Sequence, residues 1–311
     1  MARAASTSTL EDTEGAERKR KRKALAPPSP APYLLPAILV AAALSVYPLI
    51  EMVRMAFSSV GPTDLIGEWE FLGLENFRNV LASDVFWQSV RATAILTVGL
   101  IASNLVLGYL GAMALARRGR LASGVLALSV FVWALPPLVS GSVWKFMLSG
   151  DGVVNAMLGL LGVGSVNWLS SPQVALGSVT FVTAWAALPF AILVIRGGLL
   201  GISPEVLEAA AIDGAGPIRT TVSVILPLLR PTFGVLLILT ILHSFRSFDF
   251  VFVMTSGGPG TVTNTLPYFA YTTAFSSYDF GVGSTIAALS MLIIAVLAIP
   301  YILGVRKEEQ Q

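Results

Sequence analysis

Cysteine is absent from this sequence and charged residues are scarce. None of the 311 residues is Cys and one is His, so disulfides, thiolate metal sites and thiol nucleophiles are excluded. Charged residues make up 12% of the chain, whereas a soluble domain usually contains about 25%. Apolar residues reach 55%, and the mean hydropathy is +0.76. This composition predicts an integral membrane protein.

Motifs for catalysis and nucleotide binding are also missing. None of the five lysines follows a glycine, so a phosphate loop ending in Gly-Lys-Ser/Thr is absent, and HExxH and GxSxG do not occur. We therefore expect no catalytic residue, no metal site and no cofactor in this chain. The pI near 9.0 is compatible with nucleic-acid binding. However, six basic residues form one run at residues 18–23 and most others flank apolar segments, which is typical of membrane topology, so we expect no nucleic-acid partner.

Six apolar segments are long enough to cross a bilayer, because about 20 residues span its roughly 30 Å of hydrocarbon. They cover residues 34–57, 91–116, 121–147, 173–200, 229–255 and 281–304. Prolines interrupt several of these segments, and helix breakers persist in membranes where neighbouring helices or a cavity satisfy the freed carbonyls. The sequence therefore predicts an all-α membrane protein with six transmembrane helices around a pathway.

Basic residues predict the orientation, because Lys and Arg are enriched in cytoplasmic connections. With the N-terminus inside, fifteen of the 20 basic residues lie on the inner side and five on the outer side. We therefore expect both termini to be cytoplasmic. The expected order is a disordered tail at residues 1–32, a six-helix domain at 33–305 and a short tail at 306–311. Residues 201–228 form the one substantial cytoplasmic connection. We name it the EAA loop after its Glu208-Ala209-Ala210 sequence.

The EAA loop has the composition of two short helices joined by a tight turn. Ser203-Pro204-Glu205 suits a helix start, with a capping hydroxyl, a first-turn proline and an acidic residue near the positive end. Asp213-Gly214 suits its end, since glycine tolerates the left-handed conformation, and Gly216-Pro217 suits a second start. Small residues at Ala209 and Ala210 permit another backbone to approach. Local composition is equally compatible with a docking surface and with a self-contained amphipathic linker.

The same loop resembles the EAA motif of binding-protein-dependent ABC importer permeases, in which Glu-Ala-Ala, three residues, Gly and nine residues precede Ile-x-Leu-Pro. The matching residues are Glu208, Ala209, Ala210, Gly214, Leu226 and Pro227, with Asp213 and Ala215 completing an Asp-Gly-Ala version. Val224 replaces the usual Ile. Three further stretches resemble the carbohydrate branch of this family, in the first-permease type of maltose-type and glycerol-phosphate-type systems: AWAALPF (184–190), FDFVFVMTSGGPG (248–260) and DFGVGSTIAALSML (279–292).

The resemblance implies a type I ABC importer permease fold in the cytoplasmic membrane of a bacterium. It implies inward transport of a disaccharide, oligosaccharide, polyol or glycerol phosphate by alternating access. The implied partners are a second homologous permease, two ATP-binding subunits that hold ATP and Mg, an extracytoplasmic solute-binding protein and the lipid bilayer. In such importers the motif residues form a coupling helix that transmits force from the ATPase and touches no substrate.

Polar groups inside the apolar segments are candidates for the solute path. His243, Arg246 and Asp249 recur at steps of three and share one face if the fifth segment is a continuous helix. Phe248 lies in an adjacent aromatic stripe, and Trp185 lies near a proline in the fourth segment. Sugars offer hydroxyls and apolar ring faces, which such a mixture suits. The alternative is a self-neutralising Arg246–Asp249 pair among packed aromatic rings.

Two other functions stay open at this stage. One is a permease from another ABC importer branch with a non-sugar solute, because only the stretches of the carbohydrate branch argue for sugar. The other is an ion-coupled secondary transporter. Such carriers commonly contain inverted repeats with helices broken at matching positions, and the two halves of this chain show no self-similarity.

Overall fold

The computed structural model describes the backbone of residues 31–116 and 119–308, and the side chains of 33–116 and 119–299. Its contacts divide the chain into two units, Met1–Glu51 and Met52–Gln311. Four long helices have the length and composition of membrane spans: α2 (Ala31–Ala56), α4 (Asp84–Ala114), α8 (Ala175–Leu200) and α15 (Phe280–Glu308). Two bent helix pairs raise the number of candidate spans to as many as six. The predicted all-α class is confirmed in its main features.

Helix α2 is the described part of the first unit and continues to Ala56. It contains Pro36 and Pro48 within one uninterrupted helix, and its side chains are exposed from Tyr33 to Ile50, whereas Ala56 is buried. A helix that is apolar all round and uncovered by protein is typical of a membrane span. The predicted tail at residues 1–32 lies outside the described residues, apart from the first two residues of α2. At the other end, α15 continues through residues 306–308, and 309–311 are not described.

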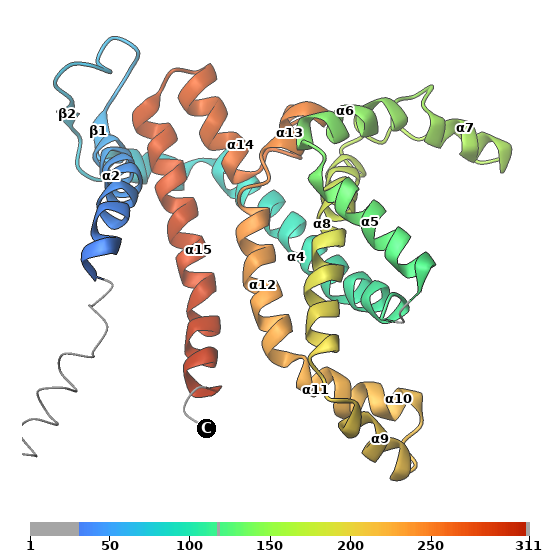
Figure 1. Ribbon diagram of the computed structural model, residues 1–311. Helices are drawn as coiled ribbons and strands as arrows, with labels where there is room; N and C mark the ends of the chain where they lie inside the picture. The colour runs from blue at the N-terminus through green and yellow to red at the C-terminus, as the bar shows by residue number, and fades with distance from the viewer. Residues whose placement is uncertain (1–30, 117–118, 309–311) are drawn as a thin grey trace, which may run out of the picture. The chain divides into compact units, whose positions relative to one another are not determined.

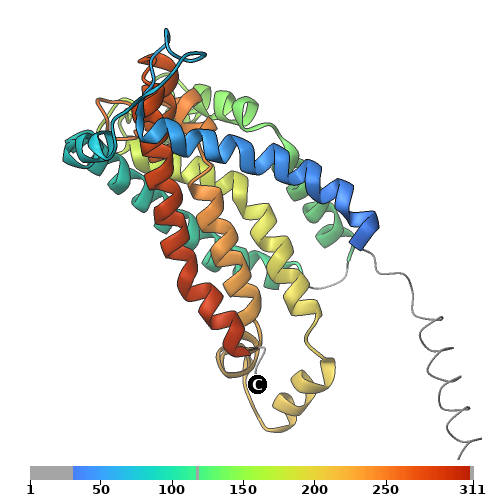
Figure 2. The same cartoon turned by 90° about the vertical axis from the view of Figure 1, so that its left-hand side faces the viewer.

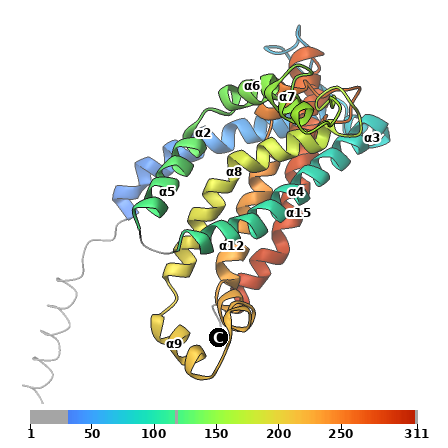
Figure 3. The same cartoon turned by 90° about the vertical axis from the view of Figure 1, so that its right-hand side faces the viewer.

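Within the second unit, α4, α8, α12 (Arg230–Ser244) and α15 form a bundle (Figures 1 and 2). Helix α4 packs along α8 and α12, and α15 packs against α12, as Figure 3 shows for α4 and α8. Small residues permit the close approach of α4 to α8. A Cβ at Gly111 would lie 2.8 Å from the side chain of Ile192.

The third predicted span, 121–147, is broken at Pro136-Pro137, as the prolines predict. It consists of α5 (Arg120–Ala134) and α6 (Pro137–Met147), bent by 99°. Leu135 is extended, with φ −66° and ψ 134°, and Pro136 follows with φ −57° and ψ 131°. A residue before proline avoids the helical conformation, and proline lacks the amide that continues a helix. The Pro136-Pro137 pair therefore ends α5 and starts α6 in a new direction.

The fifth predicted span, 229–255, is also interrupted. Helix α12 ends at Ser244, and a separate α13 occupies Asp249–Met254. Serine hydroxyls form hydrogen bonds with carbonyl oxygens of the last turn of α12. Ser244 Oγ donates to Ile241 O at 2.8 Å, and Ser247 Oγ donates to His243 O at 2.9 Å. Before α12 come α10 (Pro217–Thr220), the π-helical η1 (Thr221–Ile225) and α11 (Leu226–Leu228), bent by 65° from it.

Short elements gather at the end of this unit opposite α9 (Pro204–Ile212), α10 and α11 (Figure 1). They are a two-stranded antiparallel sheet of β1 (Ser58–Ser59) and β2 (Glu70–Phe71), α3 (Glu75–Ala82), α6, α7 (Val153–Leu160), α14 (Leu266–Tyr271) and the π-helical η2 (Thr272–Ser276). Asn76 Nδ2 donates to Ala56 O and Ser58 O at 3.2 and 2.9 Å. Thr285 Oγ1 of α15 donates to the same Ala56 carbonyl at 3.0 Å. These bonds hold α3 and β1 against α15.

Gly281, at the start of α15, permits this contact, and its replacement should destabilise the protein. A Cβ there would lie 2.5 Å from the backbone oxygen of Ser58. Overpacking against backbone costs about 1–3 kcal/mol, so we expect Gly281→Ala to lower the Tm of the purified protein. In α8, Gly177→Ala is the matched control, because a Cβ there meets no atom within 4 Å. Equal Tm values for the two variants would contradict the prediction.

Candidate functional site

Helix α9 begins where the sequence predicts. Pro204 lies in its first turn, Glu205 follows, and Ser203 is extended with ψ 133°. The predicted capping bond is wrong in detail, because the Ser203 hydroxyl makes no bond to a backbone amide. It donates instead to Glu205 Oε2 at 3.0 Å. The Ser203 hydroxyl and the Glu205 carboxylate are thus hydrogen-bonded to each other. The start of α9 is stabilised instead by the first-turn proline and by the acidic residue near the positive end of the helix.

The end of α9 explains the glycine of the EAA motif. Ala215 N donates to Ala210 O at 3.0 Å, and Gly214 N donates to Ala211 O at 3.1 Å. This pair of bonds is a Schellman motif, which requires a left-handed residue after the helix cap. Gly214 supplies it with φ +74°, and Asp213 is the cap. The predicted stop at Asp213-Gly214 and the predicted restart at Pro217 are confirmed.

The EAA loop presents an apolar end. Of the residues of α9, all of which are described, Ala210 alone is buried. Ile212 is 86% exposed and Ile218 of α10 is 81% exposed. Within the described chain, the carboxylates of Glu208 and Asp213 accept no hydrogen bond and form no ion pair. Contiguous exposed apolar side chains rimmed by polar ones mark surfaces that another protein covers.

Buried side chains connect the EAA loop to the bundle. Leu226 and Pro227 are half-buried, and their neighbours Ile225 and Leu229 are 7% and 1% exposed. These two neighbours pack in one apolar cluster with residues of α4 and α8, Ala112, Ala191 and Ile195. The end of the EAA loop is therefore packed into the same core as α4 and α8.

A cavity of about 460 Å³, named here the polar cavity, lies among α4, α5, α8 and α12. His243 and Arg246, two of the predicted path residues, line it with Asn104 of α4. Trp133 of α5 and Phe190 of α8 also line it, and their rings stack at 5.7 Å with planes 22° apart. The cavity combines donors, an acceptor and aromatic faces.

Trp185, Phe248 and Asp249 are not among the lining residues of the polar cavity. The predicted common face is wrong, because α12 ends at Ser244 and Asp249 begins α13. Phe248 instead stacks on Phe252 at 5.2 Å and on Tyr268 at 5.8 Å. Trp185 packs edge-on against Trp144 at 5.4 Å.

The alternative of a self-neutralising Arg246–Asp249 pair is also wrong. Both residues are described, and no ion pair joins them. Arg246 is exposed and lines the polar cavity. A basic group therefore faces this space without a carboxylate partner in the described chain.

Asn104 is a lining residue that the sequence prediction missed. It is the strongly polar side chain of its apolar segment, and this was the available signal. Its Nδ2 donates to Thr240 Oγ1 at 3.1 Å, and one turn along α12 Ser244 Oγ shares a hydrogen bond with Thr97 Oγ1 at 2.7 Å. These buried pairs hold α4 against α12, and the bond to Thr240 fixes the Asn104 amide.

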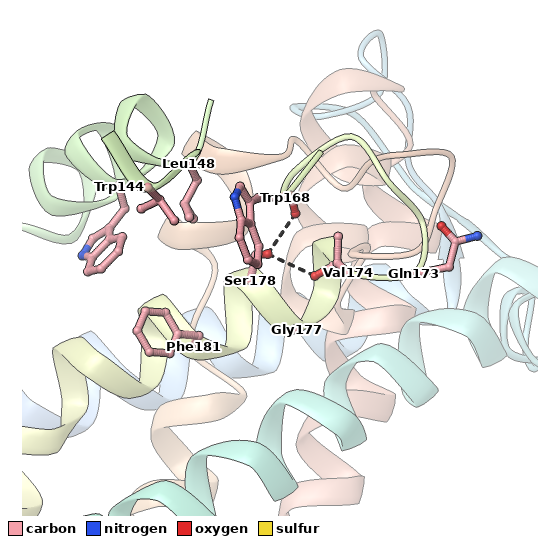
Figure 4. A pocket seen from close by; sticks show the side chains of 9 residues that line it. Trp144, Leu148, Trp168, Gln173, Val174, Gly177, Ser178 and Phe181 are labelled. Atoms are coloured by element: carbon pink, nitrogen blue, oxygen red, sulfur yellow. Dashed lines mark hydrogen bonds between the residues drawn. The ribbon is translucent and has the colours of Figure 1, made fainter. Parts of the chain in front are cut away.

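A larger cavity of about 620 Å³, named here the apolar cavity, lies near the N-terminal end of α8 (Figure 4). Trp144, Leu148 and Phe181 contribute to its wall. The Ser178 hydroxyl already donates to the carbonyl oxygens of Trp168 and Val174, with Oγ–O distances of 2.9 and 3.1 Å (Figure 4). This cavity therefore offers a polar solute fewer unoccupied partners than the polar cavity does. Among the described residues, no group of three or more His, Asp and Glu is placed to hold a metal ion.

Comparison with known proteins places these features in one family. Residues 104–306 match the family described as "Binding-protein-dependent transport system inner membrane component". A trehalose/maltose transport permease of Thermococcus litoralis is 33% identical over 76% of this chain and 80% of the relative. A sulfoquinovosyl glycerol transport permease of Agrobacterium fabrum is 34% identical over 85% and 87%. A diacetylchitobiose uptake permease of Streptomyces coelicolor is 33% identical over 90% and 88%.

Solved structures support the same fold. The crystal structure of a bacterial ABC transporter that imports the acidic polysaccharide alginate matches with a TM-score of 0.76 and 19% identity, over 94% of this chain and 98% of that one. The same type of transporter bound to its pentasaccharide-loaded periplasmic protein matches with a TM-score of 0.73. The predicted type I importer permease fold is thereby confirmed, and the family match excludes the ion-coupled carrier. The chain belongs to the binding-protein-dependent inner membrane components and is a multi-pass permease subunit of an ABC importer.

Proposed function

We propose that this permease carries a sugar or sugar-like solute inward, coupled to ATP hydrolysis through the EAA loop. The observation that carries the proposal is the exposed apolar end of α9 and α10, closed by the Schellman turn at Gly214 and joined to the bundle through buried residues. The names of three relatives specify saccharides: trehalose and maltose, sulfoquinovosyl glycerol, and diacetylchitobiose. They support a disaccharide, oligosaccharide, polyol or glycerol phosphate as the solute.

The residues of the EAA motif have three separate roles: contact with the ATP-binding subunit, closure of the turn and connection to α12. Glu208, Ala209 and Asp213 contact the ATP-binding subunit, because their side chains are exposed. The backbones of Ala210 and Ala215, with Gly214, close the turn that orients α9. Leu226 and Pro227 join this unit to α12. ATP and Mg are held by the partner subunits, since this chain contains no phosphate-binding loop.

The proposed orientation puts the EAA loop in the cytoplasm. The C-terminal end of α15 lies at the same end of the second unit as α9 (Figure 2), and the distribution of basic residues supports cytoplasmic termini. The short elements at the opposite end then face an extracytoplasmic solute-binding protein. A second permease and lipid cover the exposed apolar flanks of the membrane domain at residues 33–305, and the tails at 1–32 and 306–311 are cytoplasmic.

Alternating access exposes the polar cavity to each side in turn. His243 and Arg246 contact the solute there, because they line the cavity. Trp185 and Phe248 each pack against other aromatic rings, and Asp249 follows Phe248 in the chain. We assign them to the outer approach of the solute path, where aromatic faces and one carboxylate meet a sugar before it reaches the cavity.

Cross-linking tests the proposed contact with an ATP-binding subunit. The chain has no cysteine, so one introduced thiol reports one position. We expect Ile212→Cys, at an 86% exposed position, to cross-link to an ATP-binding subunit in membranes that contain the complete transporter. Ile66→Cys, which is fully exposed between β1 and β2, is the control and should not react with that subunit. Cross-linking at Ile66, or none at Ile212, would contradict the assigned docking face.

A further inference from the structure

We infer that the polar cavity selects a saccharide that bears an anionic group, and that Asn104 accepts a hydrogen bond from a hydroxyl of this solute. The inference deepens the proposed function and rests on it. It concerns the chemical class of the solute and adds a specificity-determining residue, Asn104, to the predicted path. Three features of the cavity support it: an unpaired basic end, a buried acceptor and an aromatic wall.

The basic end consists of His243 and Arg246. None of the residues that line the cavity is Asp or Glu, and all of them are described. Arg246 has no ion pair, and Asp249, the acidic residue nearest to it in sequence, lies in the next helix. A guanidinium group stays protonated at any physiological pH, and a charge within a membrane protein is normally paired. A carboxylate, sulfonate or phosphate of the solute supplies that partner through charge-assisted, bidentate hydrogen bonds.

The acceptor is the carboxamide oxygen of Asn104. This side chain is 3% exposed, and its Nδ2 is occupied by Thr240 Oγ1 at 3.1 Å. Its Oδ1 is buried and has no hydrogen-bond partner among the described residues. Buried polar groups are normally paired, and an exception requires an explanation. Because Asn104 lines the cavity, a hydroxyl donor from the solute provides the missing partner.

The aromatic wall consists of Trp133 and Phe190. Their rings stack at 5.7 Å and offer an apolar surface to the C–H face of a sugar ring. The cavity volume of about 460 Å³ falls within the roughly 300–1,000 Å³ usual for small-molecule sites. The site thus binds a ring face, a hydroxyl and an anionic substituent at once, and a neutral sugar leaves Arg246 unpaired.

Direct binding to the complete transporter tests the inference, without the solute-binding protein, whose own selectivity would intervene. The probes are labelled maltose, cellobiose and galactobiose, each compared with its counterpart oxidised to a carboxylate at C6 of one ring. We expect the anionic member of at least one pair to bind about tenfold or more tightly than the neutral one, as a charge-assisted bond implies. Arg246→Gln should remove the difference, and Arg246→Lys should retain part of it.

Asn104→Leu should weaken binding of both members of that pair by about tenfold, because each offers a hydroxyl. Ser244→Ala is the matched control, since it removes the neighbouring hydrogen bond between α4 and α12 at a residue that does not line the cavity. It should leave both affinities unchanged. If Ser244→Ala weakens binding as much as Asn104→Leu, the role of Asn104 is structural and this part is overturned.

The remaining outcomes separate this inference from the proposed function. Equal binding of neutral and anionic members, or an equal loss of both in Arg246→Gln, overturns anion selection while sugar transport stands. If no member of any pair binds, and the transporter with its solute-binding protein takes up none of them, the sugar assignment fails together with the inference.

Discussion

Gly214→Val is expected to reduce solute uptake and solute-stimulated ATPase activity by about tenfold or more, as an energetic penalty above 1.4 kcal/mol would. Gly214 has φ +74°, and a Cβ there would meet no atom within 4 Å. The effect therefore arises from the backbone alone, since a left-handed conformation costs about 1–2 kcal/mol for residues other than glycine, and a β-branched residue is especially disfavoured there. The Schellman turn opens, α9 loses its direction, and contact with the ATP-binding subunit is lost. The amount of protein in the membrane should not change.

Two variants in the same turn provide the controls. Gly216→Ala replaces a glycine with φ −69° and open space around its Cβ, so uptake should stay near the wild-type rate. Gly214→Asn should retain much of the activity, because asparagine tolerates the left-handed conformation. Wild-type uptake in Gly214→Val would show that the turn is not needed for coupling. Equal losses in Gly214→Val and Gly216→Ala would point to side-chain bulk in the loop.

Filling the polar cavity should block transport with comparable effect. Leu239 of α12 lines this cavity and is 37% exposed, so Leu239→Trp adds volume to the open space and disturbs no packed core. We expect uptake to fall about tenfold or more, because small misplacements of a bound solute carry costs of that order. Assembly with the ATP-binding subunits and basal ATPase activity should persist, since the EAA loop is unchanged. Transport of labelled sugar into proteoliposomes is the measurement.

The apolar cavity supplies the matched comparison for Leu239→Trp. Gly177 lines it, and a Cβ at Gly177 would meet no atom within 4 Å. Gly177→Leu therefore fills the larger cavity with a side chain of matching polarity. We expect uptake to remain close to wild type. The opposite pattern, with uptake lost in Gly177→Leu and kept in Leu239→Trp, would move the solute path to the apolar cavity.

Local chemistry made the EAA loop predictable from sequence. The start at Pro204, the stop at Asp213-Gly214 and the restart at Pro217 depend on residues within a few positions of each event. Proline removes an amide and glycine permits positive φ wherever they occur. The apolar spans were also predictable, because the thickness of the bilayer sets the number of apolar residues that a spanning helix needs.

The solute path was harder to predict, because it depends on where helices end and which helices meet. Steps of three residues place His243 and Asp249 on one face only if the helix continues, and α12 ends at Ser244. Hydroxyls at Ser244 and Ser247 bond to preceding carbonyls there, a signal that is weak in a sequence. Asn104 and Trp133 reach the same cavity from two other helices, and no pattern within one segment reveals such a meeting.

The break at Pro136-Pro137 has a consequence for the lipid environment. Helix α5 has 15 residues and thus a length of about 22 Å, while α6 crosses the end of the bundle at a large angle to it (Figure 1). The hydrocarbon layer is roughly 30 Å thick, so α5 alone is too short for it. Hydrophobic mismatch of this kind is relieved by local thinning of the bilayer. Turnover should therefore be faster in bilayers of short-chain phospholipids than in thick, long-chain ones.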